Sequence, residues 1–125
     1  MFAGKRVLIV DDHDANRLLM QRMLERLGCQ AEMAADGAQA VQRIAVEDFA
    51  VVLMDCSMPV MDGYEATRCV RLTPGPRAKV PILALTANAL PEDRQRCLDA
   101  GMDGYLSKPV RLNVLQAELA RVLKG

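Results

Sequence analysis

The sequence predicts an α/β fold in which one parallel sheet of five strands is flanked by five helices. Short apolar runs alternate along the chain with segments that have the periodicity of amphipathic helices. The apolar runs are nearly unbroken, which is typical of strands buried on both faces of a parallel sheet. This alternation favours a doubly wound fold with right-handed crossovers. No repeat, low-complexity segment or linker divides the 125 residues, so we expect a single domain over residues 1–125.

The beginning of the chain predicts a strand, a helix and a weaker strand. The first strand covers residues 5–10, where two basic residues precede an apolar run. Apolar residues then recur at helical spacing over residues 16–27. We expect Asp14 to cap the N-terminus of this helix and Gly28 to end it. Residues 29–34 predict the weaker strand.

The middle of the chain predicts two helices around a buried strand. Asp36 opens a sequence that resembles a capping box, so we expect the second helix to begin there. Residues 49–54 predict a strand buried on both faces. Asp62 is a second capping signal, for a helix that runs to about Leu72, and residues 73–76 break that helix.

The last third of the chain predicts two more strands, each followed by a helix. Residues 80–85 form the fourth apolar run. Pro91 suits the first turn of a helix that stops at Gly101. A short strand follows over residues 105–107, and apolar residues at helical spacing over residues 112–122 predict the last helix.

Composition excludes several classes of function. The chain has 16 Lys and Arg against 16 Asp and Glu, without the basic excess of a nucleic-acid-binding module. Aromatic residues are only 3% of the chain, and no apolar run approaches the length of a membrane span. The cysteines are spread without a CxxC pair, so we expect reduced thiols that pack as small hydrophobes in a cytoplasmic protein. They are Cys29, Cys56, Cys69 and Cys97.

Polar side chains follow four of the predicted strands at their carboxyl ends. Asp11 and Asp12 follow the first strand, and Asp55 follows the third. Thr86 follows the fourth strand, and Lys108 follows the fifth. In an open α/β sheet, ligands bind beyond the carboxyl ends of the strands. We therefore expect these five side chains to converge at one edge of the sheet.

Carboxylates gathered at one edge require cations, because like charges repel and raise one another's pKa. Lys108 supplies one cation, and a hard ion such as Mg²⁺ suits the carboxylate oxygens. A metal ion beside a carboxylate and a lysine is an arrangement that holds a phosphoryl group in line with a nucleophile. Aspartate is a known nucleophile for such groups, and the Thr86 hydroxyl is placed to donate to a phosphoryl oxygen.

Motifs on these elements resemble the receiver domain of two-component response regulators. They are Val10-Asp11-Asp12, Met54-Asp55-Cys56-Ser57-Met58-Pro59-Val60-Met61-Asp62-Gly63, Leu85-Thr86-Ala87-Asn88-Ala89 and Lys108-Pro109. Each motif alone is weak, but their combination in this order is very specific, and the resemblance covers residues 5–123. It implies a flavodoxin-like sheet with strand order 2-1-3-4-5.

The resemblance also implies the chemistry of the site. Asp55 would accept a phosphoryl group from a partner's phosphohistidine. Asp12, Asp55 and the backbone carbonyl of Ser57 would bind Mg²⁺ directly, and Asp11 would act on the metal mainly through water. Ser57 and Asn88 lie where the family tunes the lifetime of the acyl phosphate.

The same resemblance implies a switch. Lys108 would pair with the phosphoryl group, or with Asp55 before phosphorylation, and its bond to Pro109 is expected to be cis. Thr86 would move toward the phosphoryl oxygen, and Tyr105 would follow it inward. This movement would reshape the face formed by the helix that begins at Pro91, the strand over residues 105–107 and the last helix.

The motifs look most like those of receivers attached to hybrid sensor histidine kinases. The partner would then be a sensor histidine kinase or a histidine phosphotransfer domain, docked near the first helix and the active-site loops. A parent of this kind is a membrane protein with the receiver on its cytoplasmic side, although a stand-alone regulator is also compatible with the motifs. We expect any output to come from another domain or another protein. A phosphorylation-dependent dimer is a further consequence that such a switch allows.

Two other functions compete with a receiver that phosphorylates and dephosphorylates only itself. Asp12-His13-Asp14-Ala15 comes close to the signature of phosphatases of the haloacid dehalogenase class, but Ala15 replaces the expected Thr or Val. A pseudo-receiver used only for docking is disfavoured by the complete set of acids, Thr86 and Lys108. The single histidine, His13, sits between acids, and a phosphodonor or metal role is the alternative to the exposed residue of the first helical turn that we expect.

Overall fold

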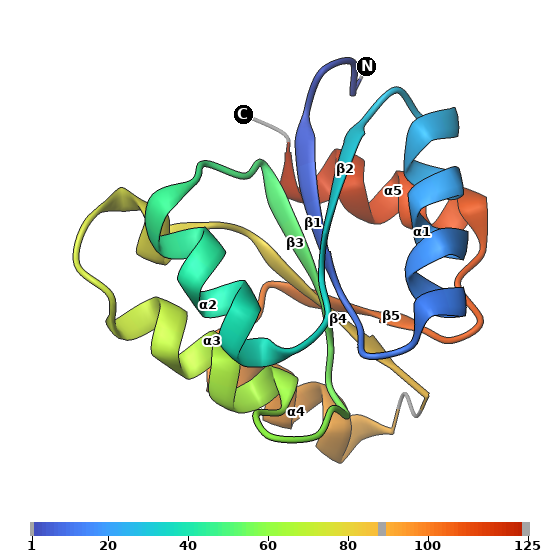
Figure 1. Ribbon diagram of the computed structural model, residues 1–125. Coiled ribbons are helices and arrows are strands. Elements are labelled where there is room, and N and C mark those ends of the chain that lie inside the picture. The colour runs from blue at the N-terminus through green and yellow to red at the C-terminus, as the bar shows by residue number, and fades with distance from the viewer. Residues whose placement is uncertain (1, 88–89, 124–125) are drawn as a thin grey trace.

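Five parallel strands form one sheet in the order β2-β1-β3-β4-β5 (Figure 1). The computed structural model describes residues 2–87 and 90–123. The strands are β1 (Arg6–Val10), β2 (Gln30–Ala34), β3 (Val51–Asp55), β4 (Ile82–Thr86) and β5 (Gly104–Ser107). This arrangement confirms the fold class and the strand order predicted from the sequence.

Helices cover both faces of the sheet, with α1 and α5 on one face and α2, α3 and α4 on the other (Figure 1). They are α1 (Asp14–Arg26), α2 (Gly37–Val46), α3 (Gly63–Leu72), α4 (Pro91–Ala100) and α5 (Leu112–Val122). A short 3-10 helix, η1 (Pro76–Lys79), follows the predicted break after α3 and was not predicted. All five predicted helices are therefore present.

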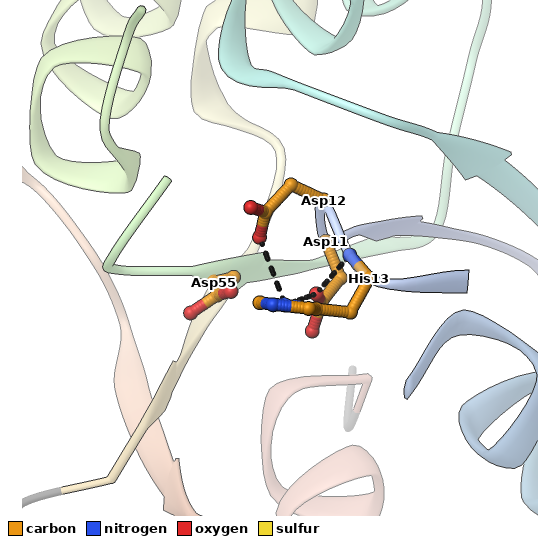
Figure 2. A group of neighbouring side chains, drawn as sticks. All are labelled: Asp11, Asp12, His13 and Asp55. Carbon is orange, nitrogen blue, oxygen red and sulfur yellow. Dashed lines mark hydrogen bonds and ion pairs between the residues drawn. The ribbon is translucent and has the colours of Figure 1, made fainter. Parts of the chain in front are cut away.

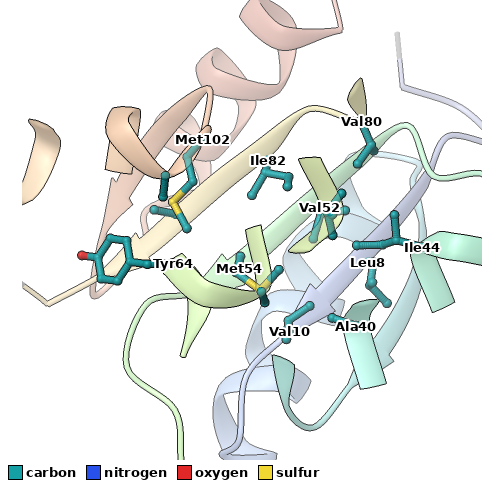
Figure 3. Close-up of a cluster of buried hydrophobic side chains, with 14 of the residues drawn as sticks. Leu8, Val10, Ala40, Ile44, Val52, Met54, Tyr64, Val80, Ile82 and Met102 are labelled. Carbon is teal, nitrogen blue, oxygen red and sulfur yellow. The ribbon is translucent and has the colours of Figure 1, made fainter. Parts of the chain in front are cut away.

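Alternate strand residues pack into two hydrophobic cores, one on each face of the sheet. On β1, Val7 and Ile9 join the core under α1 and α5, whereas Leu8 and Val10 join the core under α2, α3 and α4. Figure 3 shows the second core, in which Val10 and Leu8 lie beside side chains of α2. The central strand β3 is buried at every position, as its unbroken apolar run predicts. Burial on both faces holds the carboxyl ends of the strands in one fixed row.

Helix capping follows the prediction at α2 and α3 but not at α1. The Asp36 carboxylate accepts a hydrogen bond from the Gln39 backbone N–H, which caps α2. The prediction that Asp14 caps α1 is wrong, because the N-cap residue is His13 and Asp14 is the first helical residue. The cause lies one turn earlier, where the Asp11 carboxylate accepts a hydrogen bond from the His13 backbone N–H at 2.9 Å. This bond fixes the chain direction so that the helix begins one residue sooner than predicted.

Two backbone features lie in loops at the carboxyl edge of the sheet. The Lys108–Pro109 peptide bond is cis, as the family resemblance implies. In the loop between β3 and α3, Val60 has a φ of 69°, in the left-handed region that β-branched residues rarely adopt. The Val60 side chain is 92% exposed.

Candidate functional site

Asp11, Asp12 and Asp55 come together at the carboxyl ends of β1 and β3. The two strands are neighbours in the sheet, with Val10 opposite Met54, so the residues that follow them lie side by side. One carboxylate oxygen of each of the three acids and one ring nitrogen of His13 lie within 4.8 Å of one another. Figure 2 shows Asp11, Asp12 and His13 at the end of β1, beside Asp55 on β3. The predicted convergence of the acids is therefore present.

Two of the three carboxylates are buried. Asp11 is 0% exposed and Asp55 is 3% exposed, whereas the Asp12 side chain is 24% exposed. Buried carboxylates are stable only when paired or coordinated, because burial disfavours the charged form. Among the described residues, Lys108 is the one lysine or arginine that forms ion pairs with these two buried carboxylates. Its Nζ atom lies 3.1 Å from Asp55 Oδ1 and 3.5 Å from Asp11 Oδ2.

The pKa values of Asp55 and Lys108 show how this pair is held. Burial raises the pKa of Asp55, and the hydrogen bonds from the Ser57 backbone N–H and from Lys108 offset only part of that rise. Burial alone lowers the pKa of Lys108, but its hydrogen bond to Asp55 and the charges of Asp55 and Asp11 outweigh burial, so its pKa is raised overall. The lysine thus stays charged, and the acids retain an excess of negative charge that one lysine does not balance.

The residues at the site fit a hard divalent cation. Asp11 Oδ2 and Asp12 Oδ1 are buried atoms that accept no hydrogen bond. Buried oxygens without a donor are destabilising unless a cation or ordered water completes their coordination. Carboxylate oxygens are the ligands that Mg²⁺ prefers. Ser57 lies at the site, because its backbone N–H donates to Asp55 Oδ1 at 3.2 Å, and its predicted role as a carbonyl ligand stays a prediction.

Thr86 and Tyr105 lie on the same face of the sheet. Thr86 ends β4 and is 8% exposed, and its backbone carbonyl accepts a hydrogen bond from the Lys108 N–H at 2.8 Å. Tyr105 lies opposite Ala84, two residues before Thr86, so the side chains share one face. The half-buried Tyr105 ring packs against the core under α2, α3 and α4, with the Arg94 guanidinium 4.8 Å from its centroid.

Part of the predicted motif after β4 falls outside the described residues. Thr86 and Ala87 are described, but Asn88 and Ala89 are not. The expectation that Asn88 tunes the lifetime of an acyl phosphate therefore stays a prediction. The contact between Arg94 and Tyr105 was not predicted, because a charged residue on a helix gives no local signal of the strand that it will face.

Asp14 lies away from the acidic cluster, which weighs against the phosphatase alternative. That alternative needs a second acid two residues after Asp12 to act at the same site. The Asp14 side chain is 95% exposed and forms an ion pair with Arg17. The Arg17 guanidinium also donates to the backbone carbonyl of Asp11 at 2.6 Å, so it binds the first turn of α1 to the end of β1.

Comparison with known proteins decides the family. The sequence pattern of the response regulator receiver domain matches residues 7–120. The chain belongs to this family. In this receiver domain, the matched range contains every residue of the acidic cluster as well as Thr86, Tyr105 and Lys108.

Receivers of sensor histidine kinases are among the relatives of this receiver domain. It is 45% identical over 114 residues to the sensor histidine kinase RcsC of Salmonella typhimurium, an alignment that covers 91% of this chain and 12% of the kinase. It is similar to the crystal structure of the receiver domain of the sensor histidine kinase PA1611 from Pseudomonas aeruginosa PAO1, which holds a magnesium ion in its active-site cleft. That structure has a TM-score of 0.90 and 44% identity, and the match covers 98% of this chain and 100% of the PA1611 receiver.

A more distant structure contains a partner. The receiver domain of the Saccharomyces cerevisiae response regulator Ssk1, crystallised with the histidine phosphotransfer protein Ypd1, matches with a TM-score of 0.85 and 28% identity. The match covers 96% of this chain and 89% of that chain. None of the helices in the described residues is both long enough and apolar enough to cross a membrane.

Proposed function

We propose that this receiver domain is a phosphoacceptor, in which Asp55 takes a phosphoryl group from a phosphohistidine of a partner protein. The observation that supports this most directly is the state of Asp55, a 3% exposed carboxylate paired with Lys108 beside two further acids at the carboxyl edge of the sheet. An acid that only caps a helix or forms a turn is usually exposed to solvent, and it is not expected to be buried beside both a lysine and two further acids.

The chemical step needs a nucleophile that is charged and held in place. A carboxylate oxygen of Asp55 would attack the phosphorus, a phosphorus–oxygen bond would form, and the phosphorus–nitrogen bond to the donor imidazole would break. The Ser57 backbone N–H and Lys108 both bind Asp55 Oδ1, which leaves Oδ2 as the oxygen for attack. Hydrolysis by water would later return the carboxylate and inorganic phosphate.

Two cations would balance the charge of the bound phosphoryl group. Asp11, Asp12 and Asp55 would hold Mg²⁺, as the two undonated oxygens indicate. When bound, Mg²⁺ would neutralise charge that develops on the phosphoryl oxygens. Lys108 forms an ion pair with Asp55, and after phosphorylation its ammonium group would pair with the new phosphoryl oxygens instead.

The phosphoryl group would then act on Thr86 and Tyr105. Phosphorylation adds about −1.5 to −2 charges and three acceptor oxygens at a site that already has excess negative charge. The Thr86 hydroxyl would turn toward the new oxygens, and the Tyr105 ring on the same face would follow. A change of this kind alters the surface formed by α4, β5 and α5, which contains Tyr105.

The partner and the setting are also part of the proposal. The relatives support a sensor histidine kinase or a histidine phosphotransfer protein as the phosphoryl donor. The chain spans about one tenth of the length of the curated kinases it matches. We therefore propose that residues 1–125 form one receiver domain in the cytoplasmic part of a hybrid kinase. It would catalyse its own phosphorylation and dephosphorylation without turning over an external substrate.

Acetyl phosphate and Mg²⁺ provide a direct test that needs no knowledge of the donor. We expect a mass increase of one phosphoryl group, and peptide mapping after borohydride trapping should place it on Asp55. The control is Asp36→Asn, which changes an exposed helix-capping acid that is not part of the acidic cluster. Label on Asp12 would favour the phosphatase alternative, and failure to bind Mg²⁺ or beryllofluoride would favour the pseudo-receiver.

A further inference from the structure

His13 directs a nitrogen donor at the acidic cluster. Its Nδ1 atom lies 3.2 Å from Asp12 Oδ1 and 3.4 Å from Asp11 Oδ1 (Figure 2). The backbone on which it sits is fixed, because the His13 N–H donates to Asp11 Oδ1 at 2.9 Å. The ring is 68% exposed, so packing does not hold it there. The ring is therefore placed by its backbone and by its contacts with the Asp11 and Asp12 carboxylates.

The spacing of these donor atoms is that of neighbouring ligands around one ion. With metal–ligand distances near 2.1 Å, adjacent ligands are about 3.0 Å apart in an octahedral site and about 3.4 Å apart in a tetrahedral site. The two distances from Nδ1 fall in this range. Opposite ligands would be about 4.2 Å apart, and the four donor atoms span at most 4.8 Å. A shift of a few tenths of an ångström would gather all four.

A second observation points to a cation at the same place. Asp11 is 0% exposed, and its Oδ2 atom accepts no hydrogen bond. Asp12 Oδ1, which is the oxygen nearest to the His13 ring, accepts none either. These oxygens need a positively charged ligand in addition to Lys108, which lies 3.5 Å from the first of them.

We propose that His13 is a nitrogen ligand that lets the acidic site bind borderline divalent transition ions, Zn²⁺ above all, together with Asp11, Asp12 and Asp55. The inference deepens the proposed function, because it concerns the metal site on which phosphorylation of Asp55 depends. Mg²⁺ needs only the oxygen donors and coordinates an imidazole poorly. Zn²⁺, Co²⁺ and Ni²⁺ take imidazole readily, and their affinities for a mixed nitrogen and oxygen site exceed that of Mg²⁺.

Occupation by Zn²⁺ would compete with Mg²⁺ for the same carboxylates. The imidazole would lie at the mouth of the site, because it is the most exposed of the four donors. An ion held by four protein donors has fewer positions left for a phosphoryl oxygen, whereas Mg²⁺ usually keeps several waters that a phosphoryl oxygen can replace. Zn²⁺ would therefore inhibit phosphorylation of Asp55, and His13 would set the zinc concentration at which this happens.

The single histidine allows a direct measurement on the intact, tag-free chain. In a long-range proton–nitrogen correlation spectrum of the ring, one equivalent of Zn²⁺ should move the Nδ1 resonance to a metal-bound position, and Mg²⁺ should leave it in place. Ring resonances that are unchanged at saturating Zn²⁺ would overturn the proposal. So would an Asp12→Asn variant in which the ring resonance shifts at the same Zn²⁺ concentration as in the parent, because the Asp12 carboxylate would then not share the ion with His13.

Affinity measured by competition with a fluorescent chelator gives the second readout. His13→Asn should lower Zn²⁺ affinity at least about tenfold, the lower bound for loss of even an outer-shell partner, and should change Mg²⁺ affinity much less. Asp14→Asn is the matched control, because its side chain is adjacent in sequence but 95% exposed and outside the cluster. Equal Zn²⁺ affinity in the parent and His13→Asn would refute a ligand role.

Acetyl phosphate labelling separates this proposal from the proposed function. If Zn²⁺ moves the His13 resonance but Asp55 is never labelled with Mg²⁺, the phosphoacceptor function fails and the metal ligand stands. If Asp55 is labelled but Zn²⁺ leaves the His13 ring unchanged, the ligand role fails and the phosphoacceptor function stands.

Discussion

Arg71, which donates to three backbone carbonyls, should stabilise the fold more than Arg121, which donates to one. Its guanidinium joins two segments to the end of α3, through hydrogen bonds that it donates to the backbone carbonyls of Gly101 at 2.9 Å, Ala78 at 2.7 Å and Val80 at 2.7 Å. It also pairs with the Asp103 carboxylate at 3.0 Å. The substitution Arg71→Met keeps the aliphatic stem and removes every donor.

The expected loss follows from counting the groups left without a partner. Three carbonyls lose a charged donor, and a net value of about 1 kcal/mol for each gives about 3 kcal/mol. The Asp103 side chain is 45% exposed, so its ion pair adds little. At about 3–5 °C per kcal/mol for a chain of this size, the Tm should fall by about 10–15 °C.

Thermal and urea unfolding of matched variants would measure this loss. Arg121→Met is the control, because Arg121 reaches the same turn with one donor to the Asp103 carbonyl at 2.8 Å and its side chain is 52% exposed. We expect the control to lose under about 1 kcal/mol. A loss in Arg71→Met no larger than in the control, with the urea m-value unchanged, would refute the reasoning from carbonyls left without a donor.

Three further predictions concern charge and capping. Asp55→Asn should abolish labelling by acetyl phosphate and raise the urea midpoint at neutral pH. Burial raises the pKa of Asp55, so the contribution of this carboxyl to folding stability becomes less favourable as the pH rises above its unfolded pKa of 3.8. The amide in the Asp55→Asn variant does not ionise, so the substitution removes this loss of stability. A urea midpoint lower than that of the parent would contradict the prediction. Glu47 is the opposite case, because hydrogen bonds from Arg43 and Arg6 lower its pKa to about 2. The stability that the ionised Glu47 contributes should therefore be present above about pH 4.5 and should be lost as the pH falls toward 2. Glu47→Gln should flatten the dependence of unfolding midpoint on pH in that window, and an unchanged slope would argue against the ion pairs. Asp36→Ala removes the side-chain cap of α2 and should lower the free energy of unfolding by about 1 kcal/mol. Asp14 is not the N-cap of α1, so Asp14→Ala should lower it by less. Equal losses in the two variants would contradict the assignment of the α1 N-cap to His13.

Elements that depend on local pattern were predicted well. The run of apolar residues over 49–54 predicts a strand buried on both faces, and β3 is buried at every position because it is central in the sheet. Asp36 and Asp62 cap their helices as predicted, because a capping side chain bonds a backbone N–H only three residues away. Asp14 failed as a cap because the helix begins one residue earlier than predicted, where the hydrogen bond from the His13 N–H to the Asp11 carboxylate fixes the direction of the chain.

Contacts between distant segments were not predictable in the same way. The sequence places Lys108 after a strand, but its ion pairs with Asp55 and Asp11 depend on where β5 lies relative to β3 and β1. The same is true of Arg71, whose backbone acceptors lie 7 to 30 residues further along the chain. No periodicity or spacing near these residues indicates such partners.

The sequence by itself determined which residues form strands and helices, and which polar side chains stand at the strand ends, because both depend on neighbours within one element. Through its resemblance to receiver domains it also implied the strand order. The tertiary structure alone decided how deeply each acid is buried, which oxygens lack a donor and that His13 faces the cluster. These properties depend on distances between β1, β3 and β5, and burial then sets the pKa of Asp55 and the need for a cation.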